Sequence, residues 1–108
     1  MNVEEFAKEF GYDVVCMPNP ERSIAGGYAG DLLSWVMGRL EADSVWVTIM
    51  SNINIVAVAS LTDPSCIILA EGVTPDDGVL EKAIVQEVNI LSSKKNAFDI
   101  CADVRAAL

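Results

Sequence analysis

Five polar residues stand where apolar segments of the chain end, and they are the strongest candidates for contacting a ligand: Ser51, Asn52, Asn54, Glu71 and Thr74. Their hydroxyl, amide and carboxylate groups can hydrogen-bond a small molecule, such as the base or ribose of an adenine nucleotide. None stands beside a recognisable general base, so the set is suited to binding rather than to bond breaking. The competing interpretation is that these side chains cap helices and shape turns.

The rest of the sequence offers little catalytic chemistry. It contains no histidine, which excludes Ser-His-Asp and Cys-His mechanisms and the zinc sites that use histidine. The cysteines Cys16, Cys66 and Cys101 are widely spaced. We therefore expect them to be buried as small hydrophobic side chains, with free thiols in a reducing cytoplasm. An enzyme with Cys16 or Ser51 as nucleophile is the alternative, but neither has a recognisable base partner. We predict a protein that is not an enzyme and that uses no metal or cofactor.

One segment is rich in glycine, residues 26–30 (GGYAG). It lacks the G-x-G-x-x-G spacing of dinucleotide loops, and the chain contains no P-loop motif. Asp31 follows directly, and its carboxylate would repel a phosphate bound there. We therefore expect these glycines to let a strand pack closely against a helix.

Trp35 is the candidate for an interface. A helix over residues 31–40 would place its apolar positions within an arc of roughly 140°, facing the core; these positions are Leu32, Leu33, Val36, Met37 and Leu40. Trp35 falls outside that arc, beside Arg39. It is either a residue that packs on the flank of its own helix or, with Arg39, the anchor of a protein interface.

Composition limits the class of protein. The 108 residues are 52% hydrophobic, which excludes a disordered chain. Seven Lys and Arg oppose 16 Asp and Glu, for a formal charge of −9, and such a surface repels nucleic acid and anionic lipid. The acidic start of the chain is unlike a signal peptide, and the longest apolar run, Ile55–Ala59, is too short to span a membrane. We expect a cytoplasmic protein.

Helical and strand patterns alternate along the chain. The first half predicts a helix over 3–10, a strand over 12–16, a strand over 23–28 that returns in a hairpin, a helix over 31–40 and a strand over 44–50. By period alone, residues 52–61 fit a buried helix or a strand equally well. We predict a helix because Ser51 and Asn52 are good N-caps and Pro64 is a stop signal.

The second half continues the alternation. It predicts a strand over 66–70, a helix capped by Thr74 that runs to about Glu87, a strand over 88–91 and a terminal helix capped by Asn96. The apolar positions that these two helices would bury are Val79, Leu80, Ala83, Ile84, Phe98, Cys101 and Val104. Together the patterns predict an α/β fold, a single three-layer α/β/α domain over residues 1–108 with a mixed, mostly parallel sheet of four or five strands. Ligands of such sheets bind outside the carboxyl ends of the strands, where the five polar residues would gather.

Nearly the whole chain resembles the small stand-alone DRTGG-domain proteins of anaerobic bacteria. The resemblance is carried by residues 24–37 (IAGGYAGDLLSWVM), 46–49 (WVTI), 54–59 (NIVAVA), 67–72 (IILAEG) and 75–76 (PD). Related domains occur in phosphate acetyltransferases and between the CBS modules of nucleotide-regulated pyrophosphatases, and the fold is similar to the N-terminal domain of HPr kinase/phosphorylase. The motif that names the family belongs after the strand ending at Met50, where this chain has Ser51-Asn52-Ile53-Asn54. The kinase domain of the HPr enzymes is missing, so the resemblance does not imply kinase activity.

The resemblance implies a regulatory or protein-interaction module rather than an enzyme. The stand-alone proteins are tied to hydrogenase and redox metabolism, and in the pyrophosphatases this domain helps to form a dimer interface. We therefore predict a homodimer, with Trp35 and Arg39 in the interface and a small ligand or a protein as further partner. An adenine-nucleotide sensor that binds through the five polar residues is the alternative.

Overall fold

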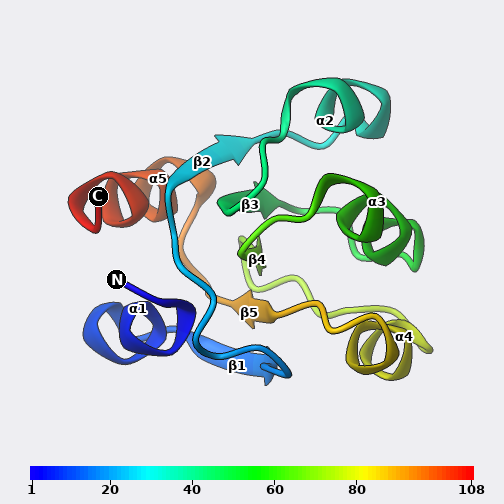
Figure 1. The fold of residues 1–108 in the computed structure, drawn as a ribbon, viewed down its shortest axis with the longest axis horizontal. Coiled ribbons are helices and arrows are strands. Elements are labelled where there is room, and N and C mark those ends of the chain that lie inside the picture. Colours follow the sequence, from blue (N-terminus) through cyan, green and yellow to red (C-terminus); the bar gives the residue numbers. More distant parts are fainter.

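The computed structural model describes residues 1–108 and is organised around one five-stranded sheet (Figure 1). The strands are β1 (Asp13–Cys16), β2 (Gly26–Ala29), β3 (Ser44–Thr48), β4 (Cys66–Leu69) and β5 (Ile90–Ser92), in the spatial order β1-β5-β4-β3-β2. Neighbours from β5 to β2 are parallel, and β1 pairs antiparallel with β5. The predicted mixed, mostly parallel sheet is confirmed, with five strands.

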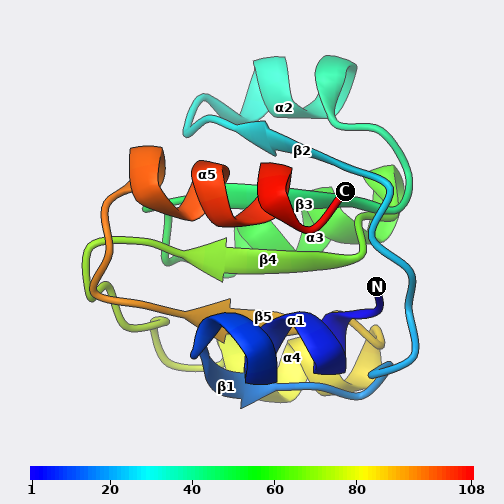
Figure 2. The same cartoon turned by 90° about the vertical axis from the view of Figure 1, so that its left-hand side faces the viewer.

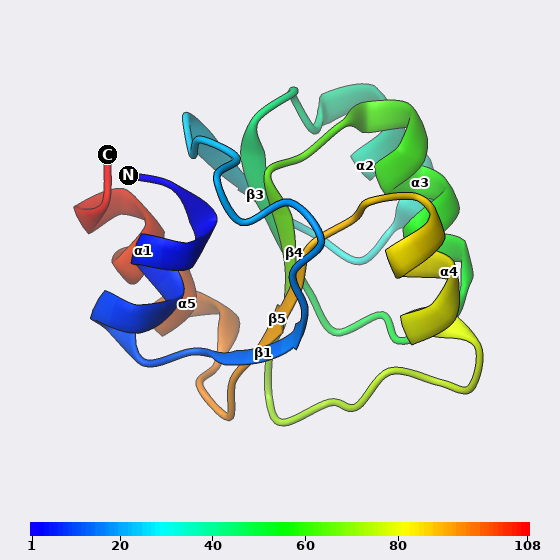
Figure 3. The same ribbon diagram turned by 60° about the horizontal axis from the view of Figure 1, so that its bottom comes forward.

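Helices cover both faces of the sheet (Figures 1 and 3). One face carries α1 (Val3–Phe10) and α5 (Ala97–Ala106); the other carries α2 (Leu33–Arg39), α3 (Asn54–Thr62) and α4 (Val79–Val85). Each layer encloses its own apolar core, of 14 buried residues on the α2–α4 side and 13 on the α1/α5 side. The three-layer α/β/α arrangement is therefore confirmed. None of the helices has the length and apolar character that crossing a lipid bilayer would require.

Local signals account for where the first and last helices begin. Asn2 and Glu5 form a reciprocal capping box at the start of α1, and Gly11 ends that helix in the left-handed conformation, with φ of 75°. The Asn96 side chain accepts a hydrogen bond from the backbone of Asp99 at the start of α5. These predicted boundaries are correct because the residues that set them act within one turn.

The ambiguous segment 52–61 is helical. It forms α3, which buries Ile55, Val56, Val58 and Ala59 against the sheet and ends at Asp63, whose φ is 60°. The following proline cannot extend the helix. The preceding strand β3 ends at Thr48, so the chain has only a short turn in which to change direction, and an adjacent strand does not form.

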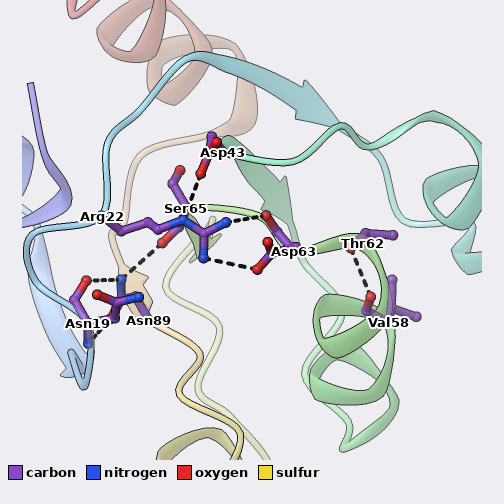
Figure 4. Close-up of polar contacts among 8 residues, drawn as sticks. All are labelled: Asn19, Arg22, Asp43, Val58, Thr62, Asp63, Ser65 and Asn89. Atoms are coloured by element: carbon purple, nitrogen blue, oxygen red, sulfur yellow. Dashed lines mark hydrogen bonds and ion pairs between the residues drawn. The ribbon is translucent and has the colours of Figure 1, made fainter.

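The predicted hairpin is wrong. β1 and β2 lie at opposite edges of the sheet, so the segment between them crosses the amino ends of the intervening strands. Figure 4 shows what holds this crossing segment: Arg22 Nε lies 2.7 Å from the Asp43 carboxylate, and Arg22 Nη1 lies 3.0 Å from that of Asp63. These acids precede β3 and β4, so one arginine links the crossing segment to two strand starts.

Asn89 holds the other end of the same crossing segment (Figure 4). It is buried, its side-chain carbonyl accepts from the backbone N–H of Asn19, and its amide donates to the carbonyls of Asn19 and Ser65. A sequence pattern read along the chain could not show this, because the partners of Asn19 and Arg22 in these side-chain hydrogen bonds lie 21 to 70 positions away.

The predicted start of the fourth helix is also wrong. Thr74 makes no capping hydrogen bond, and α4 begins at Val79 after Gly78, whose φ is 87°. The intervening loop is tied to the neighbouring one instead: the Asp76 N–H donates to the Ser51 carbonyl, and the Ser51 hydroxyl donates to the Asp76 carboxylate. This tertiary contact replaces the expected cap.

Several predicted core positions are exposed. Val36, Leu40, Val79, Ala83 and Val104 are buried as predicted. The misassigned positions are exposed: Leu32, Met37, Leu80, Ile84 and Phe98. α2 and α4 have only seven residues each, so each buries a narrow stripe, and positions at the margin of the predicted arc remain in solvent.

Candidate functional site

The parallel strands bring their carboxyl ends to one edge of the sheet, where the polar loops meet. Asp31, just after β2, accepts hydrogen bonds from the Thr48 hydroxyl at 2.8 Å and from the Ile49 N–H at 3.0 Å. Its carboxylate therefore holds the end of β2 against the end of β3.

The side chains of Ser51 and Asn52 make hydrogen bonds within the loops at this edge. The Ser51 hydroxyl donates to Asp76 at 2.9 Å and so joins the β3–α3 loop to the β4–α4 loop. The Asn52 side-chain oxygen accepts from the N–H of Asn54, the first residue of α3. Both side chains thus serve the structure of the loops, but neither is the N-cap of α3, which is Ile53.

The side chains of Asn54, Glu71 and Thr74 are exposed and make no hydrogen bond within the chain. Glu71 has a positive φ of 61°, and its N–H donates to the Lys95 carbonyl at 2.9 Å. The loops that carry the five predicted residues are therefore neighbours, but none of the five lines any of the three principal hollows of the surface.

Charge at this edge is mostly negative. Asp31, Glu71, Asp76 and Asp77 follow the strand ends, while Lys95 is engaged with Asp103 at 2.6 Å. This leaves Lys94 as the cation of the β5–α5 loop without an ion pair. A polyphosphate would meet repulsion here at close range.

The open edge of the sheet is a different environment. β2 pairs only with β3, and its residues Gly27 and Ala29 are exposed. A hollow of about 440 Å³ lies between β2 and α5, and a second of about 250 Å³ lies on the opposite face, lined by β2 and by Arg39. In Figure 2, β2 lies at the margin of the sheet with α5 beside it.

Trp35 and Arg39 lie on α2, in the layer that flanks this open edge. The Arg39 guanidinium lies over the Trp35 ring, 3.9 Å from its centroid, and Trp35 is 55% exposed. By contrast Trp46 is fully buried, and its indole N–H donates to the Gly30 carbonyl at 2.9 Å. Trp35 therefore stacks with a cation of its own helix and leaves more than half of its surface in solvent.

The thiols lie in environments that disfavour the thiolate. Burial raises the pKa of Cys66 to about 12, and it also raises the pKa values of Cys16 and Cys101 above the ordinary thiol range. A nucleophilic cysteine needs the opposite shift. The structure thus supplies no activated thiol.

A second polar cluster links α5 to the turn between α1 and β1. The Tyr12 hydroxyl donates to the Asp103 carboxylate at 2.7 Å, and the Lys95 ammonium bonds the same oxygen. Partial burial acts to raise the pKa of Asp103, but the hydrogen bonds from Lys95 and Tyr12 outweigh it, so that pKa lies below its usual value. Burial and the same hydrogen bond raise the pKa of Tyr12. This cluster fastens α5 to the turn before β1.

Sequence reasoning missed the features that distinguish the carboxyl ends of the strands from the open edge at β2. It did not find the contact between Ser51 and Asp76 or the hollows beside β2. The signal for the hollows was present, since Gly26 and Gly27 leave a strand without side chains. A Cβ added at Gly27 would lie 3.1 Å from the Val104 side chain, so the expected close packing of strand on helix is confirmed there.

Comparisons with known proteins give a match in three dimensions only. No protein-family model matches the sequence, and a search of curated proteins finds no match either. A crystal structure of the CBS and DRTGG domains of the regulatory region of Clostridium perfringens pyrophosphatase, complexed with the activator diadenosine tetraphosphate, matches with a TM-score of 0.76 at 11% identity. The match covers 99% of this chain and 47% of the other, so this chain spans about half the length of that structure. At this identity the match concerns the fold, and the fold of this chain is DRTGG-like.

Proposed function

We propose that the protein is a non-catalytic regulatory module that works through protein interaction and binds a second copy of itself. The observation that carries this proposal is the exposed Trp35 stacked with Arg39 on α2. The absence of an activated thiol and the local use of Ser51 and Asn52 support a non-catalytic role. We further propose, from the family resemblance, that this role is cytoplasmic and linked to hydrogenase or redox metabolism in an anaerobe.

The surface around Trp35 supports association with a second copy. Of 13 exposed large apolar side chains, eight belong to α2, α3, α4 or the residues that cap them: Leu32, Trp35, Met37, Ile53, Leu61, Leu80, Ile84 and Val85. Exposed apolar surface is a mark of interaction sites, and these eight side chains all come from the layer of α2, α3 and α4. Because the chain carries a formal charge of −9, two copies repel at long range, and an apolar contact centred on an aromatic residue offsets that repulsion.

Light scattering coupled to size exclusion tests the homodimer. The wild type is expected to show twice the monomer mass at micromolar concentration, and Trp35→Ala to shift the equilibrium to the monomer. Phe98→Ala is the matched control, because Phe98 is also an exposed aromatic residue but lies on α5. A wild-type monomer at high micromolar concentration, or equal dissociation by both variants, contradicts the homodimer.

An adenine-nucleotide sensor is the second candidate, favoured by the diadenosine tetraphosphate in the structural neighbour. The residues that would contact the nucleotide are the predicted set Ser51, Asn52, Asn54, Glu71 and Thr74. A thermal-shift panel of AMP, ATP and diadenosine tetraphosphate tests this role, since a ligand that binds the folded state raises Tm. Asn54→Ala and Thr74→Val should remove the shift without changing the unliganded Tm, because both side chains are exposed. No shift at millimolar nucleotide eliminates this candidate.

A further inference from the structure

The open edge of β2 has free hydrogen-bonding groups. The Gly30 N–H donates to the Val47 carbonyl at 3.1 Å, and Tyr28 is the register partner of Trp46. Groups along a parallel strand point alternately to its two sides, so Gly27 and Ala29 direct their N–H and C=O groups away from β3. Both residues are exposed. The edge therefore offers two residues with free backbone donors and acceptors.

β2 is a short edge strand of four residues, but it carries no charge, proline or bulge that would discourage pairing. Proteins commonly block an edge strand with charged side chains, proline or a bulge. β2 consists of Gly, Gly, Tyr and Ala and pairs with β3 in unbroken register. An unprotected edge is a template for a further strand.

A hollow next to the edge could take a side chain from an added strand. It measures about 440 Å³ and is bordered by Ala25, Gly27 and Ala29 on one side and by Cys101, Val104 and Arg105 of α5 on the other. The Gly27 Cβ direction points to Val104, so residues 27 and 29 face α5. Alternate side chains of an added strand face the same layer, and a large apolar one would extend into this hollow.

The shape of the hollow favours a different protein over a second copy of this chain. In a continuous sheet made by two β2 strands, the partner would present its own Gly27 and Ala29 on the α5 face. Glycine and alanine are too small to fill the hollow, so self-pairing would leave it empty. An extended segment with a leucine-sized side chain fits it better.

Charge indicates the chemistry of that segment. Arg105 is the one charged side chain that lines the hollow, it is exposed, and it makes no ion pair with any carboxylate of the chain. In a protein with 16 acidic residues, an unpaired arginine beside an apolar hollow is a local site for a carboxylate.

We propose that the β2 edge accepts an extended segment of a partner protein as an additional strand, with a large apolar side chain in the hollow under α5 and a carboxylate paired with Arg105. Main-chain hydrogen bonds to Gly27 and Ala29 supply affinity, and the hollow and Arg105 supply specificity. The inference rests on the proposed role as an interaction module. It uses β2 and α5, whereas the homodimer uses α2.

The test is a titration with a synthetic peptide of sequence Ser-Thr-Leu-Thr-Asp-Thr-Ser, followed in 1H–15N spectra of the full chain. Leu and Asp stand two positions apart and so share a face of an extended strand. We expect the Gly27 and Ala29 amides to shift and to exchange more slowly with solvent. Two N-methylated peptides, modified at the odd or at the even positions, give the sharpest comparison. Only one set of amides points to β2, so only one of the two should lose binding.

Variants of the protein test whether Arg105 pairs with the carboxylate of the peptide. Arg105→Glu should weaken the peptide about tenfold and restore binding to a peptide with Lys in place of Asp. Lys94→Glu is the matched control, because Lys94 is also a cation without an ion pair but lies in the β5–α5 loop. Ala29→Pro should abolish binding by removing a free N–H, and the N-methylated peptides decide the matter should that variant fold poorly.

Three outcomes overturn the inference: no amide shift at millimolar peptide, equal binding by both N-methylated peptides, or Gly27 and Ala29 amides that are already protected in a concentration-dependent way without peptide. The last outcome would mean that a second copy occupies the edge. The test is separate from that of the homodimer, since peptide binding by a monomeric protein would leave this inference intact and remove only the self-association.

Discussion

The two edge strands of the sheet, β1 and β2, differ in the features that prevent a further strand from pairing. β1 carries the charge of Asp13, has a register shift between Val14 and Cys16, and leads into a segment with Pro18 and Pro20. Each of these features discourages a further strand. β2, at the other edge, has no charge, proline or register shift, and it lies between two hollows. The β1 edge thus carries features that discourage a further strand, and the β2 edge lacks them, although the β1 side also borders a hollow lined by Tyr12, Val14 and Met17.

The difference between the two edges supports the proposal that the molecule interacts through its β2 side. An open edge beside an exposed Trp35–Arg39 pair is costly to leave unprotected, because it invites aggregation. The chain has the means to protect an edge, as β1 demonstrates. We therefore interpret the β2 side as a working surface and the β1 side as a structural one.

The largest expected effect on stability comes from removing the hydrogen bonds that hold the crossing segment between β1 and β2. Asn89→Ala removes the three hydrogen bonds that hold the crossing segment and leaves buried backbone groups unpaired. We expect a loss of about 2–4 kcal/mol in the free energy of unfolding, measured by urea denaturation. Asn54→Ala, at an exposed side chain, should change it by less than about 0.5 kcal/mol. Equal effects would show that the crossing segment is not held by Asn89.

The next effect tests the close packing at the open edge. Gly27→Val introduces a Cβ 3.1 Å from Val104 and branches it further, which should cost about 1–3 kcal/mol. Gly38→Ala is the matched control, because an added Cβ there meets nothing within 4 Å; in a helix it should stabilise by up to about 1 kcal/mol. A Gly27→Val protein as stable as the wild type would mean that α5 is not packed on β2 as described.

Acid should loosen the contact between α5 and the turn before β1 through Asp103. The pKa of Asp103 is lowered in the folded state, so its contribution to stability is full above its ordinary pKa of 3.8 and is lost as pH falls through the folded value. Asp103→Asn should cost on the order of 1 kcal/mol at neutral pH, and the difference between variant and wild type should shrink below pH 3.8. Urea denaturation at a series of pH values measures this. A difference independent of pH would contradict the role of the ionised carboxylate.

The smallest effect on stability is expected from a lysine placed in either edge strand, β1 or β2. These substitutions are also the most informative about function. Ala29→Lys and Val14→Lys both alter exposed strand residues and should change the free energy of unfolding by about 0.5 kcal/mol or less. Ala29→Lys should abolish peptide binding at the β2 edge, and Val14→Lys should not. Peptide binding that survives Ala29→Lys would remove the distinction between the edges.

Structural features that depend on neighbouring residues could be predicted from the sequence. Features that depend on residues distant in the chain could not. The capping box at Asn2, the cap at Asn96 and the alternation of elements act within a few positions, so the fold class and most boundaries were predictable. The hairpin was wrong because Asn89 and Asp63 hold the crossing segment from far along the chain. Thr74 was misassigned because Asp76 binds Ser51 in another loop.

The candidate site was only partly predictable for the same reason. The order of elements places the five polar residues in the loops at the strand ends, and the pattern of α2 identified Trp35 as lying off the core face. The open edge depends on which strand lies outermost, and strand order is a property of the whole sheet. Gly27 in β2 and Val104 in α5 both line the hollow under α5 but stand 77 positions apart in the chain, and no local pattern encodes such a pairing.

The central claim is that the β2 side, and not the carboxyl edge of the sheet, is where the molecule makes its contacts. The most direct test records 1H–15N spectra of one sample series in which the protein is concentrated, then mixed with the Leu-Asp peptide, then with diadenosine tetraphosphate. We predict that concentration shifts the Trp35 indole signal, that the peptide shifts Gly27 and Ala29, and that the nucleotide shifts neither. Shifts confined to residues 51–54 and 71–74 on adding the nucleotide, with Trp35, Gly27 and Ala29 unchanged throughout, would contradict the account.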